Sequence, residues 1–180
     1  QSDVSAVYVP VGGGGLLGSI WRGYRRLARE TPCLVGVQPQ GCPTLSRGLA
    51  GDLEPLSRPV STTISGLQVP VLFDYGAIDA VRETNGRVVE VTDGRAWEAQ
   101  SILAREEGIF VEPAGATALA GLFADIEAGR VGPDEDVVVV LSGAGHKDPA
   151  AVTRMAAGNA PVIVTADEVA AAFESIRARS

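Results

Sequence analysis

Four consecutive glycines, Gly12 to Gly15, separate a short apolar run from a segment with helical spacing. The apolar run at 6–11 predicts a buried strand, and 16–30 predicts a helix. The apolar side chains expected on the inner face of this helix are Leu16, Ile20, Tyr24 and Leu27. Glycine lets the backbone approach an anion closely because it has no Cβ, and the free N–H groups of a helix start favour negative charge. The unit therefore predicts a phosphate-binding loop between a strand and a helix.

Two familiar phosphate motifs do not explain this loop. A Walker A loop needs Gly-Lys-Ser or Gly-Lys-Thr after its glycines, and that tripeptide is absent from the sequence. The spacing of Gly13, Gly15 and Gly18 matches a dinucleotide fingerprint, but 33–39 holds no acidic residue for a ribose. A flavin- or nucleotide-binding protein is therefore disfavoured. The structural alternative is a tight turn retained for packing, although four adjacent glycines exceed what packing needs.

The remainder of the chain alternates between apolar runs and helical patterns. Further strands are predicted at Cys33–Val37, Arg87–Val91, Asp136–Leu141 and Val162–Val164, with helices at about 44–50, 75–83, 95–107, 113–128, 149–157 and 166–177. Residues 51–70 are rich in Pro, Ser, Thr and Gly and predict a long loop, a feature that is usually functional or mobile. Continuous apolar strands predict a parallel sheet that is covered on both faces. We therefore expect an α/β fold, a three-layer open parallel sheet with helices on both faces, in a single domain over 1–180.

Composition excludes several classes of partner. The net charge is −7 and no basic stripe is visible, so we expect no nucleic acid. No apolar run reaches the roughly 18 residues of a membrane span. No signal peptide is visible either, which favours a cytoplasmic protein without a membrane partner. Cys33 and Cys42 do not form a metal-ligand pattern, so we expect no metal site and interpret both as packing residues.

Two further stretches place polar groups at the ends of elements. The apolar run 137–141 ends in Ser142, at the carboxyl end of a predicted strand, where ligands bind in open α/β sheets. A serine hydroxyl there can hydrogen-bond a ring nitrogen without carrying a charge. Glu112 precedes Pro113 at a predicted helix start, where a carboxylate suits the helix dipole. Each feature has an ordinary alternative, a turn after a strand or a capped buried helix.

Three stretches, taken in their order and spacing, resemble one family. They are the glycines with Leu16, the run Glu-Gly-Ile-Phe-Val-Glu-Pro-Ala-Gly-Ala at 107–116, and Val-Val-Val-Leu-Ser-Gly-x-Gly-x-Lys-Asp at 138–148. This combination resembles the C-terminal part of the fold-type II pyridoxal-phosphate (PLP) enzymes, which are similar to the β subunit of tryptophan synthase. Threonine synthase is the nearest relative, followed by the threonine/serine dehydratases. The similarity runs from about Val7 to Pro149.

The resemblance assigns a role to several of these positions. It implies that backbone amides hold the phosphate of PLP at Gly12, Gly13, Gly14, Gly15 and Leu16. It implies that Ser142 hydrogen-bonds the pyridine nitrogen, and that Glu112 and Gly143 belong to the wall of the active site. A neutral hydroxyl leaves that nitrogen unprotonated, and the weaker electron sink that results suits elimination and replacement at a β or γ carbon.

Gln38 bears on which reaction the resemblance implies. Dehydratases and serine racemases of the family tend to carry a glutamate here that helps bind a cation, so Gln38 favours threonine synthase. Ala144 departs from the pattern, because many threonine synthases carry histidine there, and His146 follows two positions later. The resemblance thus implies a PLP-dependent lyase or synthase for a small amino-acid substrate, most like threonine synthase, which performs β,γ-replacement on O-phosphohomoserine. The alternatives are dehydratase-like β-elimination and a non-catalytic remnant of the fold that binds a phosphorylated ligand.

Lys147 is the only lysine of the chain. Family members bind PLP covalently through a Schiff-base lysine in their N-terminal half, whereas Lys147 belongs to the later Gly-x-Lys-Asp motif. We therefore expect the chain to be the C-terminal portion of such an enzyme, without a catalytic residue of its own and inactive when isolated. Its expected partners are the missing N-terminal half, from the same gene or as a separate chain, and a second copy in a homo-oligomer, a dimer, once complete.

Overall fold

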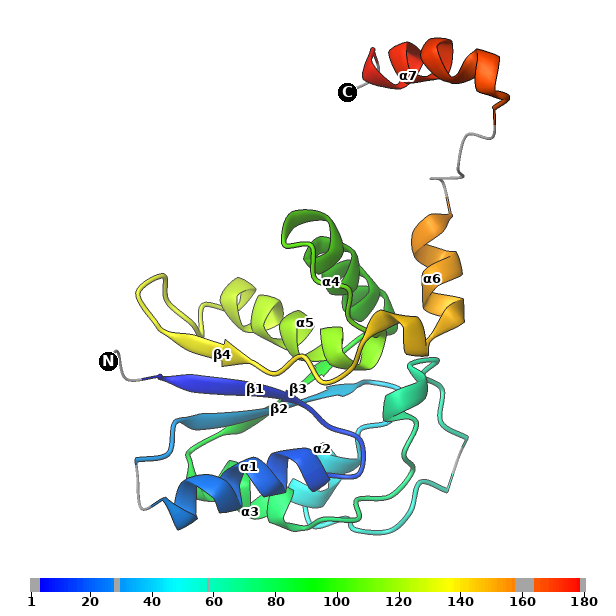
Figure 1. Ribbon diagram of the computed structural model, residues 1–180. Coiled ribbons are helices and arrows are strands. Elements are labelled where there is room, and N and C mark those ends of the chain that lie inside the picture. Colours follow the sequence, from blue (N-terminus) through cyan, green and yellow to red (C-terminus); the bar gives the residue numbers. More distant parts are fainter. Residues whose placement is uncertain (1–3, 28–29, 58, 158–163, 179–180) are drawn as a thin grey trace.

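The computed structural model describes residues 4–27, 30–57, 59–157 and 164–178. In these ranges the chain forms one four-stranded parallel sheet with the strand order β3-β2-β1-β4. Its strands are β1 (Ala6–Pro10), β2 (Cys33–Pro39), β3 (Arg87–Val91) and β4 (Val137–Val139). Because the strands run parallel, their carboxyl ends meet at one edge of the sheet (Figure 1). The predicted α/β fold with a parallel sheet is confirmed.

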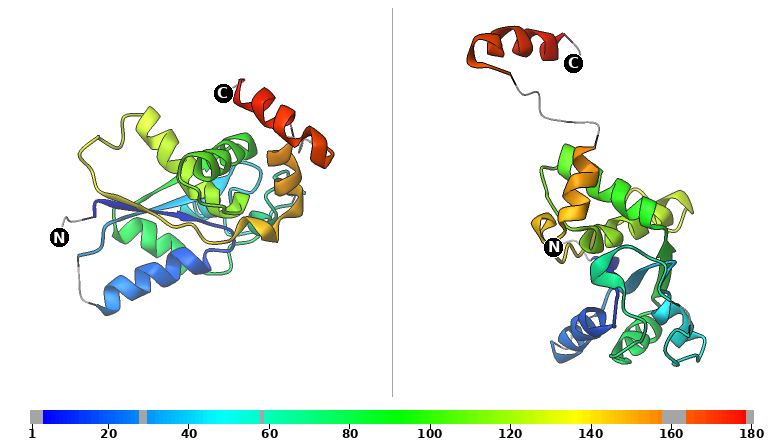
Figure 2. Two further views of the ribbon diagram at one scale, coloured as in Figure 1. Left: turned by 45° about the horizontal axis from the view of Figure 1, so that its top comes forward. Right: turned by 90° about the vertical axis from the view of Figure 1, so that its right-hand side faces the viewer.

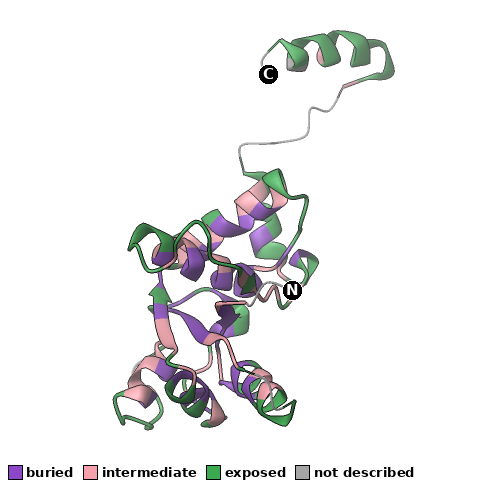
Figure 3. Cartoon of the chain, turned by 90° about the vertical axis from the view of Figure 1, so that its left-hand side faces the viewer, coloured by how far each residue is buried: buried purple, intermediate pink, exposed green. Residues whose placement is uncertain are grey.

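Helices cover both faces of the sheet (Figure 1, Figure 2). One face carries α1 (Gly15–Arg26), α2 (Thr44–Leu49) and α3 (Gly76–Glu83), and the other carries α4 (Asp93–Glu106) and α5 (Pro113–Glu127). Side chains alternate along β1, so that Val7 and Val9 pack toward α1 whereas Tyr8 packs toward α5. Figure 3 shows the buried residues concentrated in the sheet and on the helix faces that are turned toward it. The predicted three-layer arrangement is therefore confirmed.

The remaining elements are short and lie in the long loop (51–70) or after β4. They are η1 (Ser65–Leu67), η2 (Gly145–Lys147), α6 (Pro149–Ala156), η3 (Ala166–Glu168) and α7 (Val169–Arg177). The strand predicted at Val162–Val164 lies almost entirely outside the described residues. Within the described ranges, no helix has the length and apolar character that a membrane crossing requires. The single domain over 1–180 stays a prediction.

The inner face of α1 differs from the predicted one. Leu17 and Trp21 are buried against the sheet, whereas Leu16 and Leu27 are 42% and 68% exposed. The prediction was wrong for Leu16 and Leu27, whereas Ile20 packs against the same buried cluster. Leu17 takes the inward position because it packs over Gly36 of β2. A Cβ at Gly36 would lie 3.2 Å from Leu17 Cδ2, so the missing side chain leaves the space that Leu17 occupies.

Several element boundaries differ from the predicted ones, and those of α4 and β4 have local reasons. Helix α4 begins at Asp93 because the Thr92 side chain accepts a hydrogen bond from Arg95 N (3.3 Å) and caps the helix. Strand β4 ends at Val139, although Val140 N still donates to Tyr8 O (2.9 Å). The strand predicted over 136–141 is therefore shorter, and its last residues become the loop that carries Ser142.

Asp125, near the end of α5, is a fully buried carboxylate beside the first residue of β3. Its Oδ2 accepts hydrogen bonds from Tyr8 Oη (2.7 Å) and Arg87 Nε (2.6 Å), and its Oδ1 accepts one from Arg130 Nε (2.7 Å). Burial alone would raise the pKa of Asp125, but these hydrogen bonds hold it below its ordinary value. The carboxylate thereby ties β1 and β3 to the helix that covers them.

Replacing this carboxylate in Asp125→Asn should lower the free energy of unfolding by about 3 kcal/mol, because two guanidinium groups and a buried hydroxyl lose their charged partner. The pKa of Asp125 is lower in the folded state than in the unfolded state. Its contribution is therefore present above about pH 4 and is lost as the pH falls through the folded pKa.

Urea unfolding at about pH 7 and about pH 3 measures this difference, which should be large at the higher pH and smaller at the lower one. Asp134→Asn removes an exposed carboxylate and serves as the control. Equal unfolding midpoints for Asp125→Asn and the wild type at neutral pH would contradict the role of the buried group.

Candidate cofactor site

The glycine loop (Gly12–Gly15) turns sharply between β1 and α1. Gly14 is the N-cap of α1 and has a φ of +92°, a conformation that L side chains rarely adopt. A Cβ at Gly14 would lie 2.6 Å from Asp74 O. The carbonyl of Gly13 accepts hydrogen bonds from Phe73 N (2.9 Å) and Asp74 N (3.0 Å). The segment that precedes α3 therefore fixes the loop from behind, and a side chain at Gly14 would strain it.

Asp74 also ties this segment to α1. Its carboxylate accepts hydrogen bonds from Arg22 Nη2 (2.7 Å) and from Gly76 N (2.9 Å). The hydrogen bond from Arg22 holds the pKa of Asp74 below its usual range. A Cβ at Gly18 would lie 2.9 Å from Asp74 Oδ2, so the glycine at this position lets the carboxylate approach the helix closely. The first turns of α1 are thus fixed relative to the glycine loop.

The front of the loop is a row of hydrogen-bond donors. The backbone N–H groups of five consecutive residues, Gly12 to Leu16, donate to no acceptor within the ranges that the structure describes. They lie at the start of α1, where the helix dipole adds positive potential. Unpaired N–H groups at a helix N-terminus form an anion-binding site, because they supply several donors and a favourable field together.

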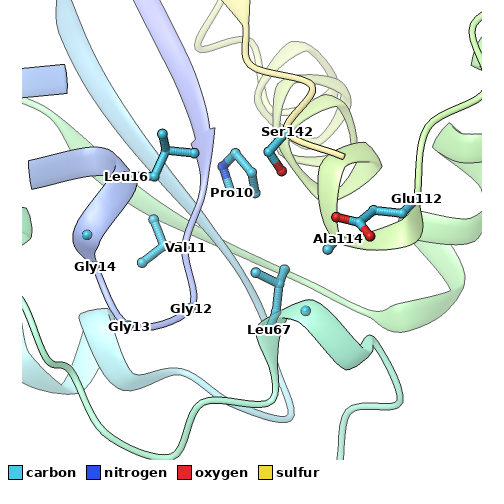
Figure 4. A pocket seen from close by; sticks show the side chains of 12 residues that line it. Pro10, Val11, Gly12, Gly13, Gly14, Leu16, Leu67, Glu112, Ala114 and Ser142 are labelled. Carbon is cyan, nitrogen blue, oxygen red and sulfur yellow. The ribbon is translucent and has the colours of Figure 1, made fainter. Parts of the chain in front are cut away.

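A cavity of about 240 Å³ lies in front of these donors (Figure 4). Four parts of the chain line it: Pro10, Val11, Gly12, Gly13, Gly14, Gly15, Leu16, Gly66, Leu67, Glu112, Ala114 and Ser142. The structure therefore brings the predicted glycine loop and Leu16 together with Ser142 and Glu112 around one space. Gly143 is the exception, because it does not line the cavity and its carbonyl accepts a hydrogen bond from Glu112 N (2.9 Å).

A short antiparallel contact brings Ser142 and Glu112 together. Val111 and Ala144 form a β-bridge, which holds the loop after β4 against the start of α5. A Cβ at Gly115 would lie 3.1 Å from Ser142 N, so the first turn of α5 packs directly against the backbone of Ser142. Figure 4 shows the side chains of Ser142 and Glu112 across the cavity from the glycine loop. The hydroxyl and the donor row therefore face one ligand space from two sides.

The cavity wall that faces Gly12 was not predicted from the sequence. Gly66 and Leu67 of η1 form it, and a Cβ at Gly12 would lie 3.4 Å from Gly66 O and 3.7 Å from Leu67 Cα. Length and composition marked the long loop as functional or mobile, but no motif singled out these two residues. The other missed lining residues lie within two positions of predicted ones: Pro10, Val11 and Ala114.

Comparison with known proteins agrees with this geometry. The family model described as "Pyridoxal-phosphate dependent enzyme" matches residues 1–143. Threonine synthase of Methanocaldococcus jannaschii is 36% identical over 171 residues, which are 89% of this chain and 41% of that protein. Threonine synthase of Mycobacterium leprae is 32% identical over 164 residues, 88% of this chain and 44% of that protein. The solved structure of the processed form of threonine deaminase isoform 2 from Solanum lycopersicum matches with a TM-score of 0.73 and 27% identity, over 86% of this chain and 44% of that chain.

The chain belongs to the pyridoxal-phosphate-dependent enzyme family. The predicted resemblance to fold-type II enzymes and the predicted cofactor, PLP, are thereby confirmed. The chain spans 41% and 44% of the two threonine synthases named above, so it corresponds to less than half of each.

Gln38 connects the glycine loop of this PLP-family chain to α2. The side chain is fully buried at the end of β2, and its Oε1 accepts a hydrogen bond from Leu45 N (2.8 Å). Its Nε2 donates to Val11 O (3.4 Å) and to Thr44 Oγ1 (3.1 Å). Thr44 Oγ1 in turn donates to Gly12 O (3.4 Å). Position 38 needs an amide side chain, because Oε1 accepts hydrogen bonds while Nε2 donates them.

Lys147 and His146 lie outside the cavity. Both residues are exposed in η2, and neither lines the ligand space. Within the described ranges, no group of three or more His, Cys, Asp or Glu side chains is placed to hold a metal ion. The polar groups that line the cavity are therefore backbone groups, the Ser142 hydroxyl and the Glu112 carboxylate.

Changing the amide to a carboxylate in Gln38→Glu should lower the free energy of unfolding at neutral pH by about 2 kcal/mol, because Val11 O loses its donor and a charge is buried. The loss should shrink in mild acid, since a protonated carboxyl can donate again. Urea unfolding at neutral pH and in mild acid measures both the loss of stability and its dependence on pH. Gln40→Glu makes the same change at an exposed position and is the control. A Gln38→Glu variant as stable as the wild type at neutral pH would rule out a need for the amide.

Proposed function

We propose that this chain is the cofactor-phosphate-binding part of a PLP-dependent lyase or synthase that acts on a small amino acid. The observation that carries the proposal is the row of N–H groups from Gly12 to Leu16, which have no acceptor among the described residues and belong to residues that line one cavity with Ser142. A phosphate ester on a planar nitrogen heterocycle needs these two kinds of contact: several donors for its anionic end and one hydroxyl for its ring nitrogen.

The residues present fit pyridoxal phosphate. The N–H groups of Gly12 to Leu16 would hold the phosphate, and the positive end of the α1 dipole would stabilise its charge. A side chain at Gly13 would displace Phe73, because a Cβ there would lie 2.7 Å from Phe73 Cδ2. Glu112 would form part of the wall of the cofactor site. The cofactor, when bound, supplies a conjugated ring that stabilises negative charge on a substrate carbon.

The Ser142 hydroxyl would set how strongly the ring withdraws electrons. A neutral hydroxyl donates a hydrogen bond to the pyridine nitrogen and does not protonate it. Of the residues that line the cavity, Glu112 is the one carboxylate, and it belongs to the start of α5. An unprotonated ring suits elimination or replacement at a β or γ carbon, which is the class of reaction we propose.

Within this class, we propose replacement of the threonine-synthase type, with O-phosphohomoserine as the substrate. The two threonine synthases that are 36% and 32% identical to the chain support this choice. Gln38 supports it as well, because its amide hydrogen-bonds Leu45 and Val11 at the position where dehydratases carry a cation-binding glutamate. The second candidate is β-elimination of the dehydratase type, which the similarity to the tomato threonine deaminase favours.

We infer that the amine that binds PLP covalently comes from another segment of a complete enzyme. Lys147 is the only lysine of the sequence, and its exposed position in η2 lies outside the cavity lining. The completing segment would be an N-terminal half, from the same gene or as a separate chain, and the complete enzyme would be a homo-oligomer such as a dimer. The 180 residues alone are accordingly expected to be inactive.

Adding a methyl group in Gly14→Ala should abolish saturable binding of PLP, because the new Cβ would collide with Asp74 O and the positive φ disfavours alanine. Titration of the purified chain, followed by absorbance or fluorescence, measures the binding. Gly23→Ala is the matched control, since a Cβ at this position of α1 meets no atom of the described residues within 4 Å. Unchanged PLP affinity in Gly14→Ala would refute the phosphate role of the loop, and wild-type binding no tighter than that of a simple phosphate ester would favour the non-catalytic remnant.

Borohydride reduction in the presence of PLP tests where the covalent lysine lies, because reduction makes the bond between PLP and a lysine amine permanent. In a preparation that contains the completing polypeptide, we expect the label on a lysine of that polypeptide, located by peptide mass spectrometry. Lys147→Arg, which removes the one lysine of this chain, should leave that label unchanged. Turnover by the isolated chain, lost in Lys147→Arg, is the result that would defeat the inference.

A further inference from the structure

Asp93, the first residue of α4, binds the long loop through both of its carboxylate oxygens. Thr62 Oγ1 donates to Oδ1 (2.6 Å), while Thr63 N (2.7 Å) and Thr63 Oγ1 (2.8 Å) donate to Oδ2. Thr62 is 3% exposed, so its hydroxyl is removed from water and depends on this acceptor. One carboxylate therefore satisfies three donors from two adjacent residues of the loop.

The residues held by Asp93 lead directly into the cavity wall. Ile64 is 1% exposed and packs with Leu67 and Ala114 in a small apolar cluster. Leu67 N donates to Ile64 O (2.9 Å) and closes η1, which places Gly66 and Leu67 at the cavity (Figure 4). A Cβ at Gly66 would lie 2.9 Å from Ala114 Cβ, so this backbone has little room to shift toward α5. The contacts at 62–64 therefore set the position of the wall that faces the glycine loop.

The charge of Asp93 strengthens this contact. Among the described residues Asp93 forms no ion pair with an arginine or lysine. It lies in the first turn of α4, where the helix dipole stabilises a negative charge, and hydrogen bonds to a charged acceptor are stronger than neutral ones. An asparagine here would have one acceptor oxygen, and its NH₂ group would face a donor from the loop.

We propose that Asp93 is a positioning residue for the cofactor site. By fixing Thr62 and Thr63, it sets the wall formed by Gly66 and Leu67 and thereby the affinity of the cavity for PLP. Asp93 does not line the cavity itself, so it acts through the loop. The proposal rests on the proposed function, because it takes PLP as the ligand.

Asp93→Asn tests the proposal, with Asp79→Asn as the matched control. Asp79 is an exposed carboxylate in the first turn of α3, so its replacement removes the same charge from the same kind of helix position. We expect the Kd for PLP to rise about tenfold in Asp93→Asn and to stay at the wild-type value in Asp79→Asn. Hydrogen–deuterium exchange of the ligand-free chain should become faster at 61–68 in Asp93→Asn only, with β1 and β2 exchanging as in the wild type.

Thr63→Val provides a milder second variant. Thr63 is exposed, so the change removes one hydrogen bond to Asp93 and leaves the buried Thr62 in place. We expect Thr63→Val to raise the Kd for PLP about threefold in the wild-type background and to have no further effect in Asp93→Asn, since the hydroxyl then has lost its charged acceptor. A merely structural role would lower the thermal stability of both variants without changing the Kd for PLP.

The proposal is overturned if Asp93→Asn binds PLP as tightly as the wild type, or if exchange at 61–68 does not change. Failure of the proposed function gives a different result in the wild-type protein. Its affinity for PLP would then be no higher than its affinity for pyridoxal, which lacks the phosphate. In that case Asp93 would not affect PLP affinity. The hydrogen–deuterium exchange rates at 61–68 would still decide whether Asp93 fixes the loop.

Discussion

The contact between the glycine loop and the segment before α3 determines the rest of the site. Two backbone N–H groups, those of Phe73 and Asp74, bond the Gly13 carbonyl from behind, and the N–H groups on the other side of the loop are left without an acceptor in the described part of the chain. No side chain supplies these donors. The loop therefore depends on where β1 ends and α1 begins, and both are fixed by burial of apolar residues in the layer between the sheet and its helices.

The two ends of the strands carry different groups: the cavity lies at the carboxyl ends, and the buried ion pairs lie near the opposite ends. At the carboxyl edge, four segments that are far apart in the sequence meet around one cavity, as parallel sheets favour. Near the other edge, Asp125 collects hydrogen bonds from Tyr8, Arg87 and Arg130 and holds β1, β3 and α5 together. The ionic groups there are paired with one another, whereas the donors at the carboxyl edge have no acceptor in the described part of the chain.

The parts of the fold that could be predicted from the sequence depend on local pattern. Apolar runs marked β1, β2 and β3, the glycines marked the loop, and Ser142 was marked by its place after the run of valines. What was missed depends on contacts between distant segments. The inner face of α1 follows from the space that Gly36 leaves for Leu17, and Gly66 enters the cavity wall because Asp93 holds the loop that precedes it. The periodicity of apolar residues cannot predict either the Leu17–Gly36 contact or the hydrogen bonds of Asp93, because each joins residues that are many positions apart.

The support behind the glycine loop also has an entropic consequence. Glycine loses more conformational freedom than any other residue when its backbone becomes fixed, and this chain has four in succession. Here the freedom is lost during folding, through the bond from Val11 N to Val37 O (2.8 Å), the two bonds to Gly13 O and the start of α1. An anion bound as proposed would therefore meet a loop that is already held in place, and a further loss of chain entropy would not diminish the free energy of its contacts. In the proposed role, a phosphate would dock onto a loop that these hydrogen bonds already hold in place, and the loop would not have to fold around its ligand.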